Sequence, residues 1–214
     1  MAIHAITVLL CDDHPMVRNG FKQLLESVPD IVVAIEAETG EQAYQAYRKQ
    51  SVDLIIMDIS MPGMGGLAAA RHILEYDHKA KIMMLTMHDS QTYVARALKL
   101  GVKGYLTKMA EPDELIKAVR LMDRGRSYIE ASLAHDLAVS NMSGDSDPID
   151  ILSPREFEVF AALADGRSVK SISSLLHLSP KTVGVHRTNI MRKMSADNLA
   201  DITRLAIRHG VVTV

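Results

Sequence analysis

Two adjacent carboxylates, Asp12 and Asp13, directly follow the apolar run ITVLLC at residues 6–11. Neighbouring like charges repel, so each carboxylate raises the free energy needed to ionise the other. A bound cation would relieve this repulsion, and carboxylate oxygens are ligands that Mg²⁺ prefers. A third carboxylate, Asp58, stands near the end of the apolar run at 54–59. The three together would make a hard oxygen site suited to Mg²⁺.

A hydroxyl and an ammonium group stand at similar places farther along the chain. Thr86 lies near the end of the run at 81–87, and Lys108 follows the run at 103–107. Both groups are good hydrogen-bond partners for phosphoryl oxygens. Beside them, Asp58 could act as a carboxylate nucleophile that accepts a phosphoryl group. Each residue alone could be an ordinary solvated or structural residue, but their joint placement favours a shared phosphoryl-transfer site.

A parallel sheet would bring these residues together. Five short apolar runs alternate with five segments of helical periodicity. The runs are 6–11, 31–37, 54–59, 81–87 and 103–107, and the later helical segments are 40–49, 67–76, 91–100 and 113–124. This alternation predicts an α/β fold, a doubly wound five-stranded parallel sheet covered on both faces. Ligands of such sheets bind beyond the carboxyl ends of the strands, so the polar side chains should converge there.

The composition is typical of a globular chain with no export or membrane segment. Of the 214 residues, 48% are hydrophobic, which is enough to build sizeable cores. The N-terminal apolar run is too short for a signal peptide, and none reaches the roughly 18 residues of a membrane helix. The single cysteine, Cys11, allows no internal disulfide and reads as a small core residue. We therefore expect a protein of the reducing cytoplasm.

The chain divides into two domains. We expect an α/β domain at 1–126, a linker at 127–150, and a helical domain at 151–214. The segment 139–150 is rich in Ser, Asp and Gly and has no apolar periodicity, while 130–138 could form a short helix.

The charge is distributed unevenly between these domains. Residues 149–214 carry nine Lys and Arg against six Asp and Glu, while 1–148 carry 15 against 20. A basic module behind an acidic one suggests a polyanionic partner. The surplus is small, so the sign of the charge alone is weak support.

The second domain shows start signals for four short helices. The expected N-caps are Ser153, Ser168, Ser179 and either Ser195 or Asp197. Ser153 and Glu156 have the spacing of a capping box, with Pro154 at the first helical position. Four helices in so few residues predict a compact all-α module.

The third of these helices, PKTVGVHRTNIMRKM, has two distinct faces. Val183, Ile190 and Met194 share one face and should pack into the core. A short turn joins it to the preceding helix, a helix-turn-helix pattern whose later helix is shaped to enter the major groove. Side chains suited to base edges or phosphates are Lys170, Lys181, Thr182, Val185, His186, Arg187, Thr188, Asn189 and Lys193. By periodicity alone, these could equally be solvated residues of a small bundle.

The motifs CDDHPMVRNG, LIIMDISMPGMGG, LTMHD and KGYLTK resemble those of the receiver domain of bacterial two-component response regulators, over residues 5–125. The resemblance implies that a sensor histidine kinase phosphorylates Asp58. It also implies that Asp12, Asp13 and Asp58 bind Mg²⁺ together with the backbone carbonyl of Ser60.

The same resemblance assigns roles to the other polar residues of the site. It implies that Thr86 and Lys108 hold the phosphoryl group and that Tyr105 changes rotamer together with Thr86. The alternative for Tyr105 is a half-buried strand residue with a packing role only. Ser60 and His88 stand close to these residues and could tune the lifetime of the phosphate.

The segment from Leu152 to Val212 resembles the DNA-binding domain of NarL/FixJ-type, or LuxR-type, regulators. The pairing implies a transcription regulator, not an enzyme beyond slow self-phosphorylation and self-dephosphorylation. Phosphorylation would relieve masking of the DNA-binding helix by the receiver and promote a homodimer on promoter DNA. A contact with RNA polymerase is also expected, and no membrane partner is. Gly184 and Thr188 stand where members often have basic residues, which leaves the sequence preference open.

The last helix has two interpretations. Its apolar residues Leu199, Ile202, Leu205 and Ala206 could supply a dimer contact. They could instead complete the core of the helical module.

Two rival functions are open to the same residues. A metal-dependent phosphohydrolase would also use Mg²⁺ and Asp58, but it would leave the helix-turn-helix unexplained and no general acid stands out. A DNA-binding protein with a vestigial receiver is the other rival, and the intact acidic residues argue against it. A third pattern, G-x-G-x-x-A at 63–68, follows the third apolar run rather than the first, so we expect a turn there and not a dinucleotide site.

Overall fold

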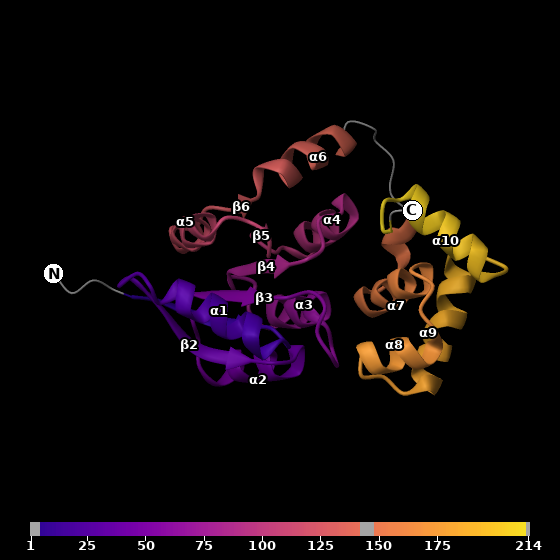
Figure 1. Cartoon of the computed structure of the whole chain (residues 1–214), viewed down its shortest axis with the longest axis horizontal. Helices are drawn as coiled ribbons and strands as arrows, with labels where there is room; N and C mark the ends of the chain where they lie inside the picture. The colour runs from indigo at the N-terminus through magenta and orange to yellow at the C-terminus, as the bar shows by residue number, and fades with distance from the viewer. Residues whose placement is uncertain (1–4, 142–147, 213–214) are drawn as a thin grey trace.

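The computed structural model describes residues 5–141 and 148–212, which form an α/β domain followed by a helical domain (Figure 1). The elements of the first domain are β1 (Ile6–Cys11), α1 (Pro15–Leu25), β2 (Ile31–Ala37), α2 (Gly40–Lys49), β3 (Leu54–Met57), α3 (Gly66–Tyr76), β4 (Ile82–Thr86), α4 (Gln91–Leu100), β5 (Gly104–Thr107) and α5 (Pro112–Asp123). The predicted alternation of strands and helices is therefore confirmed.

The strands form one parallel sheet in the order β2-β1-β3-β4-β5-β6. The sixth strand, β6 (Tyr128–Ile129), pairs with β5 and was not predicted. Its two residues are too few to show any alternation of apolar and polar side chains, so the strand is recognised only from the pairing of Tyr128 with Gly104 and of Ile129 with Tyr105.

Alternate residues of the central strands face opposite layers of helices. Leu9 and Ile55 belong to the core formed with α2, α3 and α4. Val8 and Ile56 belong to the core formed with α1 and α5. Because both faces are covered, the four central strands are almost continuous apolar runs rather than alternating ones. The polar residues are thereby left to the strand ends.

The segment between the domains contains more helix than the sequence suggested. Helix α6 (Ala131–Asn141) packs against α4 and extends beyond the expected 130–138. A 3₁₀ helix, η1 (Pro148–Ile151), precedes the second domain, with Ile149 fully buried. Residues 142–147 of the predicted linker lie outside the described residues. The domain boundaries themselves stay a prediction.

The helical domain contains α7 (Pro154–Ala164), α8 (Val169–Leu175), α9 (Pro180–Lys193) and α10 (Leu199–Arg208). The predicted capping box of Ser153 and Glu156 is present, and Ser168 and Ser179 cap α8 and α9. The predicted cap of the fourth helix is wrong: Asn198 caps α10 in a second capping box with Asp201. Asn198 is the cap rather than Ser195 or Asp197 because it forms reciprocal hydrogen bonds with Asp201. Its side chain accepts from Asp201 N, and the Asp201 side chain accepts from Asn198 N.

Helix α10 completes the core of the helical domain through its inward face. Ile202 and Ala206 are fully buried, and α10 packs against α7. Ile202 and Ala206 therefore complete the core of the helical domain and are not available for a dimer contact. Leu199 and Ile207 stay exposed on the outer face.

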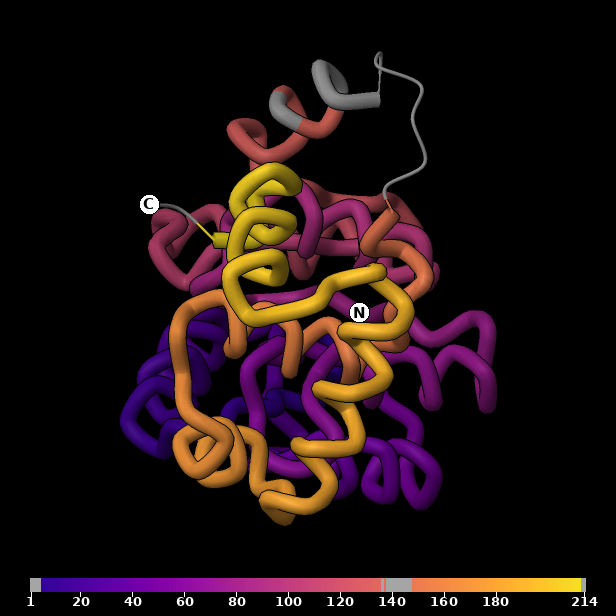
Figure 2. Tube along the Cα trace, turned by 90° about the vertical axis from the view of Figure 1, so that its right-hand side faces the viewer, coloured from indigo at the N-terminus to yellow at the C-terminus, as the bar shows by residue number. Residues whose placement is uncertain are grey.

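The two domains contact each other through α7, α8 and the end of α10. Figure 1 shows α7 and α8 on the side of the α/β domain and α9 on the far side, and Figure 2, seen from that side, shows the helical domain in front. The structure thus differs from the expected masking, since the receiver does not cover α9. The reason is that α7 and α8 occupy the interface.

Candidate functional site

The acidic residues predicted to share a site meet at the carboxyl edge of the sheet. Asp12 follows β1 and Asp58 follows β3, and both are almost fully buried. Their backbones continue the sheet hydrogen bonding, with Asp12 N donating to Ala37 O and Asp58 N to Cys11 O. One ligand atom from each of Asp12, Asp13, His14 and Asp58 lies within 4.8 Å of the others. The fold therefore gathers three carboxylates and one imidazole.

Lys108 neutralises part of this negative charge. Its Nζ lies 2.6 Å from Asp12 Oδ2 and 2.7 Å from Asp58 Oδ2. Its backbone N–H donates to Thr86 O, which fixes the turn after β5 to the end of β4. Burial alone would lower the pKa of Lys108, but the adjacent carboxylates of Asp58 and Asp12 raise it overall. The lysine is therefore held as a cation beside Asp58.

Within the acidic site, Asp58 Oδ1 remains buried without a hydrogen-bond donor, and Asp13 Oδ1 is buried with only the ring nitrogen of His14 beside it. Burial raises the pKa of Asp13, and the charges of Asp12 and Asp58 act in the same direction against the lowering effect of His14. A buried carboxylate oxygen without a partner destabilises the fold unless a hydrogen-bond donor or a cation interacts with it. The donor set and the unsatisfied Asp58 oxygen fit the Mg²⁺ expected here.

The predicted switch pair lies next to this cluster. Thr86 is fully buried, and its Oγ1 accepts a hydrogen bond from His88 N at 3.3 Å. Tyr105 is also fully buried, and its hydroxyl donates to His88 O at 2.7 Å. The expected half-burial of Tyr105 is therefore wrong, while a packing role for this residue fits its full burial. The rotamer change itself stays a prediction.

Two residues of the site were not assigned a role from the sequence. Arg18 is buried and donates to the backbone carbonyl of Asp12 at 2.6 Å, while it pairs with Glu36 near the end of β2 and with Glu38 just after it. His14 points its Nδ1 toward Asp13 Oδ1 at 2.8 Å. Two sequence features could have indicated these residues. Arg18 lies next to the apolar face of α1, and His14 directly follows two aspartates.

The loop from Asp58 to α3 contains the glycines of the G-x-G-x-x-A pattern. Gly63 and Gly65 have positive φ values, and Gly66 N donates to Ile59 O. A Cβ on Gly66 would overlap the carbonyl oxygen of Asp58. These glycines are therefore explained by a tight turn that positions Asp58.

Replacing Gly66 with alanine should destabilise the first domain, because the new methyl group would collide with the backbone at Asp58. We expect a loss of roughly 1–3 kcal/mol in the free energy of unfolding, measured by urea titration. Gly20→Ala is the matched control, since its added Cβ meets no atom within 4 Å in α1. Equal stability of the two variants would contradict the steric argument.

The residues predicted to contact DNA lie mostly on the outer side of α9. Lys181, Val185 and Thr188 are exposed, as is Lys170 on α8. The half-buried members of the set are Thr182, His186, Arg187, Asn189 and Lys193. The arrangement leaves one face of the helix free for a duplex. The individual contacts stay predictions.

Three of these side chains already have partners within the domain. Lys193 Nζ contacts Glu156 Oε2 at 2.6 Å, so a phosphate would have to compete with this carboxylate. Thr188 Oγ1 donates to Gly184 O, and Thr182 is tied to the cap residue Ser179.

An aromatic stack links the acidic site to the helical domain. Ser60 Oγ and His88 Nε2 are 2.7 Å apart, and the His88 ring stacks on Tyr93 of α4 with 4.1 Å between centroids. Tyr93 meets Phe157 of α7 edge to face at 4.8 Å. The guanidinium of Arg96 lies 4.1 Å from the Phe157 ring centroid. The loop residues of the acidic site are thus in contact with α7 through α4.

Further contacts hold the domains together. Arg96 donates to the carbonyls of Ile149 and Leu152, before α7. Gly63 N donates to Leu176 O at 3.2 Å, and Thr92 Oγ1 to His209 O at 2.6 Å. The interface therefore includes the loop that follows Asp58.

A buried carboxylate lies at the same interface. Glu158 of α7 pairs with Arg155 and packs so closely against Gly65 that a Cβ there would collide with it. Burial raises the pKa of Glu158 to about 7, and its Oε1 lacks a hydrogen-bond donor. A side chain at position 65 would require the Glu158 carboxylate to move and would be strained by the positive φ of this residue.

Comparison with known proteins matches both domains. Residues 8–120 match the response regulator receiver domain, and residues 150–206 match the luxR family of bacterial regulatory proteins. The response regulator UvrY of Escherichia coli (strain K12) is 39% identical over 208 residues, covering 96% of this chain and 95% of UvrY. GacA of Pseudomonas aeruginosa is 35% identical over 209 residues, covering 97% and 98%.

A solved structure resembles the whole chain. RcsB from Salmonella enterica serovar Typhimurium, bound to promoter rprA in the presence of the phosphomimetic BeF₃⁻, has a TM-score of 0.65 and 26% identity. The match covers 94% of this chain and 98% of RcsB. Within the described residues, no helix is both long and apolar enough to span a membrane. These relatives are transcription regulators rather than conventional enzymes, and the chain belongs to the two-component response regulators that join a receiver domain to a LuxR-type DNA-binding domain.

Proposed function

We propose that a sensor histidine kinase phosphorylates Asp58 and that this phosphorylation controls binding of α9 to promoter DNA. The observation that carries the proposal is the position of Asp58, buried at the sheet edge with Oδ2 held by Lys108 and Oδ1 free of any donor. In the transfer, the P–N bond of the phosphohistidine breaks as a P–O bond to an Asp58 carboxylate oxygen forms.

The surrounding residues would stabilise the added charge. Asp12, Asp13, Asp58 and the backbone carbonyl of Ser60 would hold Mg²⁺, and the bound ion would offset the negative charge of the phosphoryl group. Lys108 would donate to one phosphoryl oxygen, and Thr86 would turn its hydroxyl toward another, followed by Tyr105. Phosphorylation adds roughly −1.5 to −2 charges, which favours the conformation that best surrounds this charge.

Control would then run through the domain interface rather than through direct cover of α9. A shift of Thr86 and His88 would disturb the stack of His88, Tyr93 and Phe157 that joins the domains. Release of α7 would let two helical domains pair on one promoter, with the exposed Leu199 and Ile207 of α10 as the expected contact. A solved RcsB structure contains two dimers bound to two parallel DNAs, which supports a homodimer here.

The proposed cellular location follows from the proposed partner, promoter DNA. Promoter DNA is double-stranded and cytoplasmic, so we assign the chain to the cytoplasm. A contact with RNA polymerase is also proposed, on the ground that a bound regulator acts on transcription.

The test measures promoter affinity of the full chain before and after treatment with acetyl phosphate and Mg²⁺, on DNA fragments first recovered by genome-wide mapping of bound sites. A coupling of about 1–3 kcal/mol would tighten binding roughly 5- to 150-fold and leave some activity without phosphate. Unchanged affinity in a fully phosphorylated sample would refute control of DNA binding by Asp58.

Replacing Lys181 with alanine should weaken binding to every DNA sequence and reduce the slope of log K against log salt by about 1, because one phosphate contact is lost. Lys181 is exposed at the start of α9 and has no structural contact among those described. Electrophoretic shift assays at several salt concentrations measure the slope. Lys49→Ala, an exposed lysine on α2, is the control, and an unchanged slope for Lys181→Ala would remove it from the interface.

A further inference from the structure

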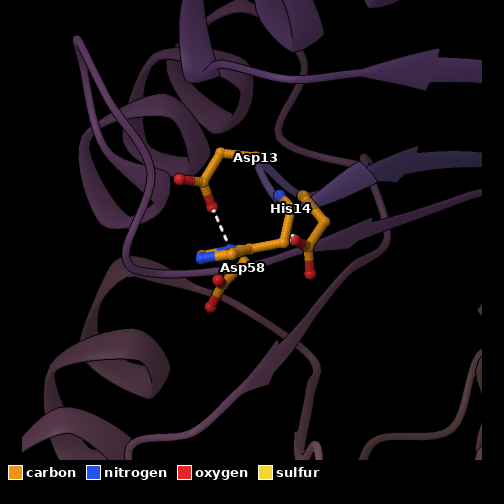
Figure 3. A group of neighbouring side chains, drawn as sticks. Asp13, His14 and Asp58 are labelled. Carbon is orange, nitrogen blue, oxygen red and sulfur yellow. Dashed lines mark hydrogen bonds and ion pairs between the residues drawn. The ribbon is translucent and has the colours of Figure 1, made fainter. Parts of the chain in front are cut away.

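His14 lies inside the acidic site rather than beside it. It is the N-cap of α1, and its side chain makes no capping hydrogen bond. Its Nδ1 lies 2.8 Å from Asp13 Oδ1 and 3.5 Å from Asp12 Oδ1. Figure 3 shows the imidazole between the carboxylates of Asp13 and Asp58. The ring therefore offers a nitrogen to the same space as the carboxylate oxygens.

The rest of the site also contains a carboxylate oxygen that is available to a cation. Lys108 contacts the Oδ2 atoms of Asp12 and Asp58, and no contact joins it to Asp58 Oδ1. Asp58, which is 4% exposed, keeps its Oδ1 buried without any partner. This oxygen is the independent sign that a ligand belongs there, because the Lys108 ammonium does not satisfy it.

We propose that His14 is a metal ligand of this site, and that it raises the affinity of the site for Zn²⁺ far more than the affinity for Mg²⁺. The inference rests on the proposed cation site at Asp13 and Asp58. Mg²⁺ is a hard ion that takes oxygen ligands, and it gains little from an imidazole. Zn²⁺ binds both histidine nitrogen and carboxylate oxygen, and four donors of these two kinds match its usual coordination number.

The position of His14 also implies that Zn²⁺ would compete with Mg²⁺ for the acidic site. Its side chain is 65% exposed, so it forms the solvent-facing part of the acidic site, whereas Asp12 and Asp58 are buried. A Zn²⁺ ion held through His14 would compete with Mg²⁺ for Asp13 and Asp58. Zinc would then occupy the acidic site in place of the ion that phosphorylation needs.

The experiment measures binding of Zn²⁺ and of Mg²⁺ separately to the full, metal-free chain by isothermal titration calorimetry. Removing a first ligand should weaken Zn²⁺ binding in His14→Gln at least about tenfold, since even outer partners of ligands contribute about 10- to 100-fold. Mg²⁺ affinity should change less than about twofold, because magnesium makes little use of nitrogen. His135→Gln, an exposed histidine on α6, controls for zinc bound by other histidines.

A second readout identifies the ligand atom. The ¹⁵N resonance of the His14 Nδ1 should shift strongly on addition of Zn²⁺ and stay in place with Mg²⁺, and the His14→Gln variant assigns the signal. A Zn²⁺ affinity that is the same in wild type and His14→Gln, with no shift of this resonance, would overturn the assignment while leaving the Mg²⁺ site intact. Failure of the wild type to bind either ion, with Asp13→Asn indistinguishable from it, would instead refute the cation site itself.

Discussion

Replacing Asp58 with asparagine should abolish labelling of the chain by radioactive acetyl phosphate in the presence of Mg²⁺. The amide of asparagine is nearly isosteric with the carboxylate, but it has no anionic oxygen to attack phosphorus. The backbone at this position is held by Cys11 O and by the turn to Gly66, so the substitution should leave the fold intact. Circular dichroism checks the fold, and the incorporated label measures the loss.

The matched control for this experiment is Asp89→Asn. Asp89 is an exposed carboxylate in the loop after β4, close in sequence to His88, and could in principle accept a phosphoryl group. We expect its replacement to leave labelling unchanged, because no lysine among the described residues pairs with it as Lys108 pairs with Asp58. If the label persisted in Asp58→Asn and disappeared in Asp89→Asn, the phosphoryl acceptor would be Asp89 after β4 rather than Asp58 after β3.

Much of the acidic site could be predicted because it follows from the position of polar residues along the chain. In a parallel sheet covered on both faces, central strands are apolar throughout, so the first polar residues mark their ends. Asp12, Asp58 and Thr86 all stand at such points, and Lys108 follows one residue after β5. The convergence of parallel strands at one edge then brings residues together that are distant in sequence.

The roles of His14 and Arg18 could not be predicted in the same way. The direction of His14 Nδ1 depends on a side-chain rotamer at the start of α1, and sequence spacing does not determine it. Arg18 is buried because Glu36 and Glu38 approach it from the end of β2. That approach depends on the packing of α1 against the sheet, which is a tertiary property.

The contacts between the domains could not be predicted from the sequence either, and the reason is again tertiary packing. Tyr93 and Phe157 each occupy the apolar face of an amphipathic helix, which would predict burial in the helix's own domain. In the structure the two rings meet each other across the interface, with Arg96 against Phe157. The pattern of a single helix cannot distinguish a core position from a docking position. For the same reason, the outward orientation of α9 emerged only from the structure.

Replacing Tyr93 with alanine should separate the domains without phosphorylation. The Tyr93 side chain is 4% exposed, and its ring bridges His88 in the first domain and Phe157 in the second. Removing a buried aromatic ring of this kind costs about 3–5 kcal/mol of packing. Much of that loss falls on the interface, because Phe157 would lose the ring that packs against its edge. Amide hydrogen exchange in α7 should therefore become faster in the unphosphorylated chain.

If the interface restrains the DNA-binding domain, the same variant should bind promoter DNA more tightly than the unphosphorylated wild type, by up to the roughly 5- to 150-fold range typical of coupled sites. Tyr93→Phe is the matched control, because it keeps the ring and both stacking contacts and should behave like the wild type. Labelling of Asp58 by acetyl phosphate checks that the receiver of Tyr93→Ala is still folded. Faster exchange in α7 without a gain in DNA affinity would show that the interface holds the domains together but does not restrain DNA binding. Unchanged exchange would show that the aromatic stack does not hold the domains together, because Tyr93→Ala removes the ring contact with Phe157 while the contact of Arg96 with Phe157 remains.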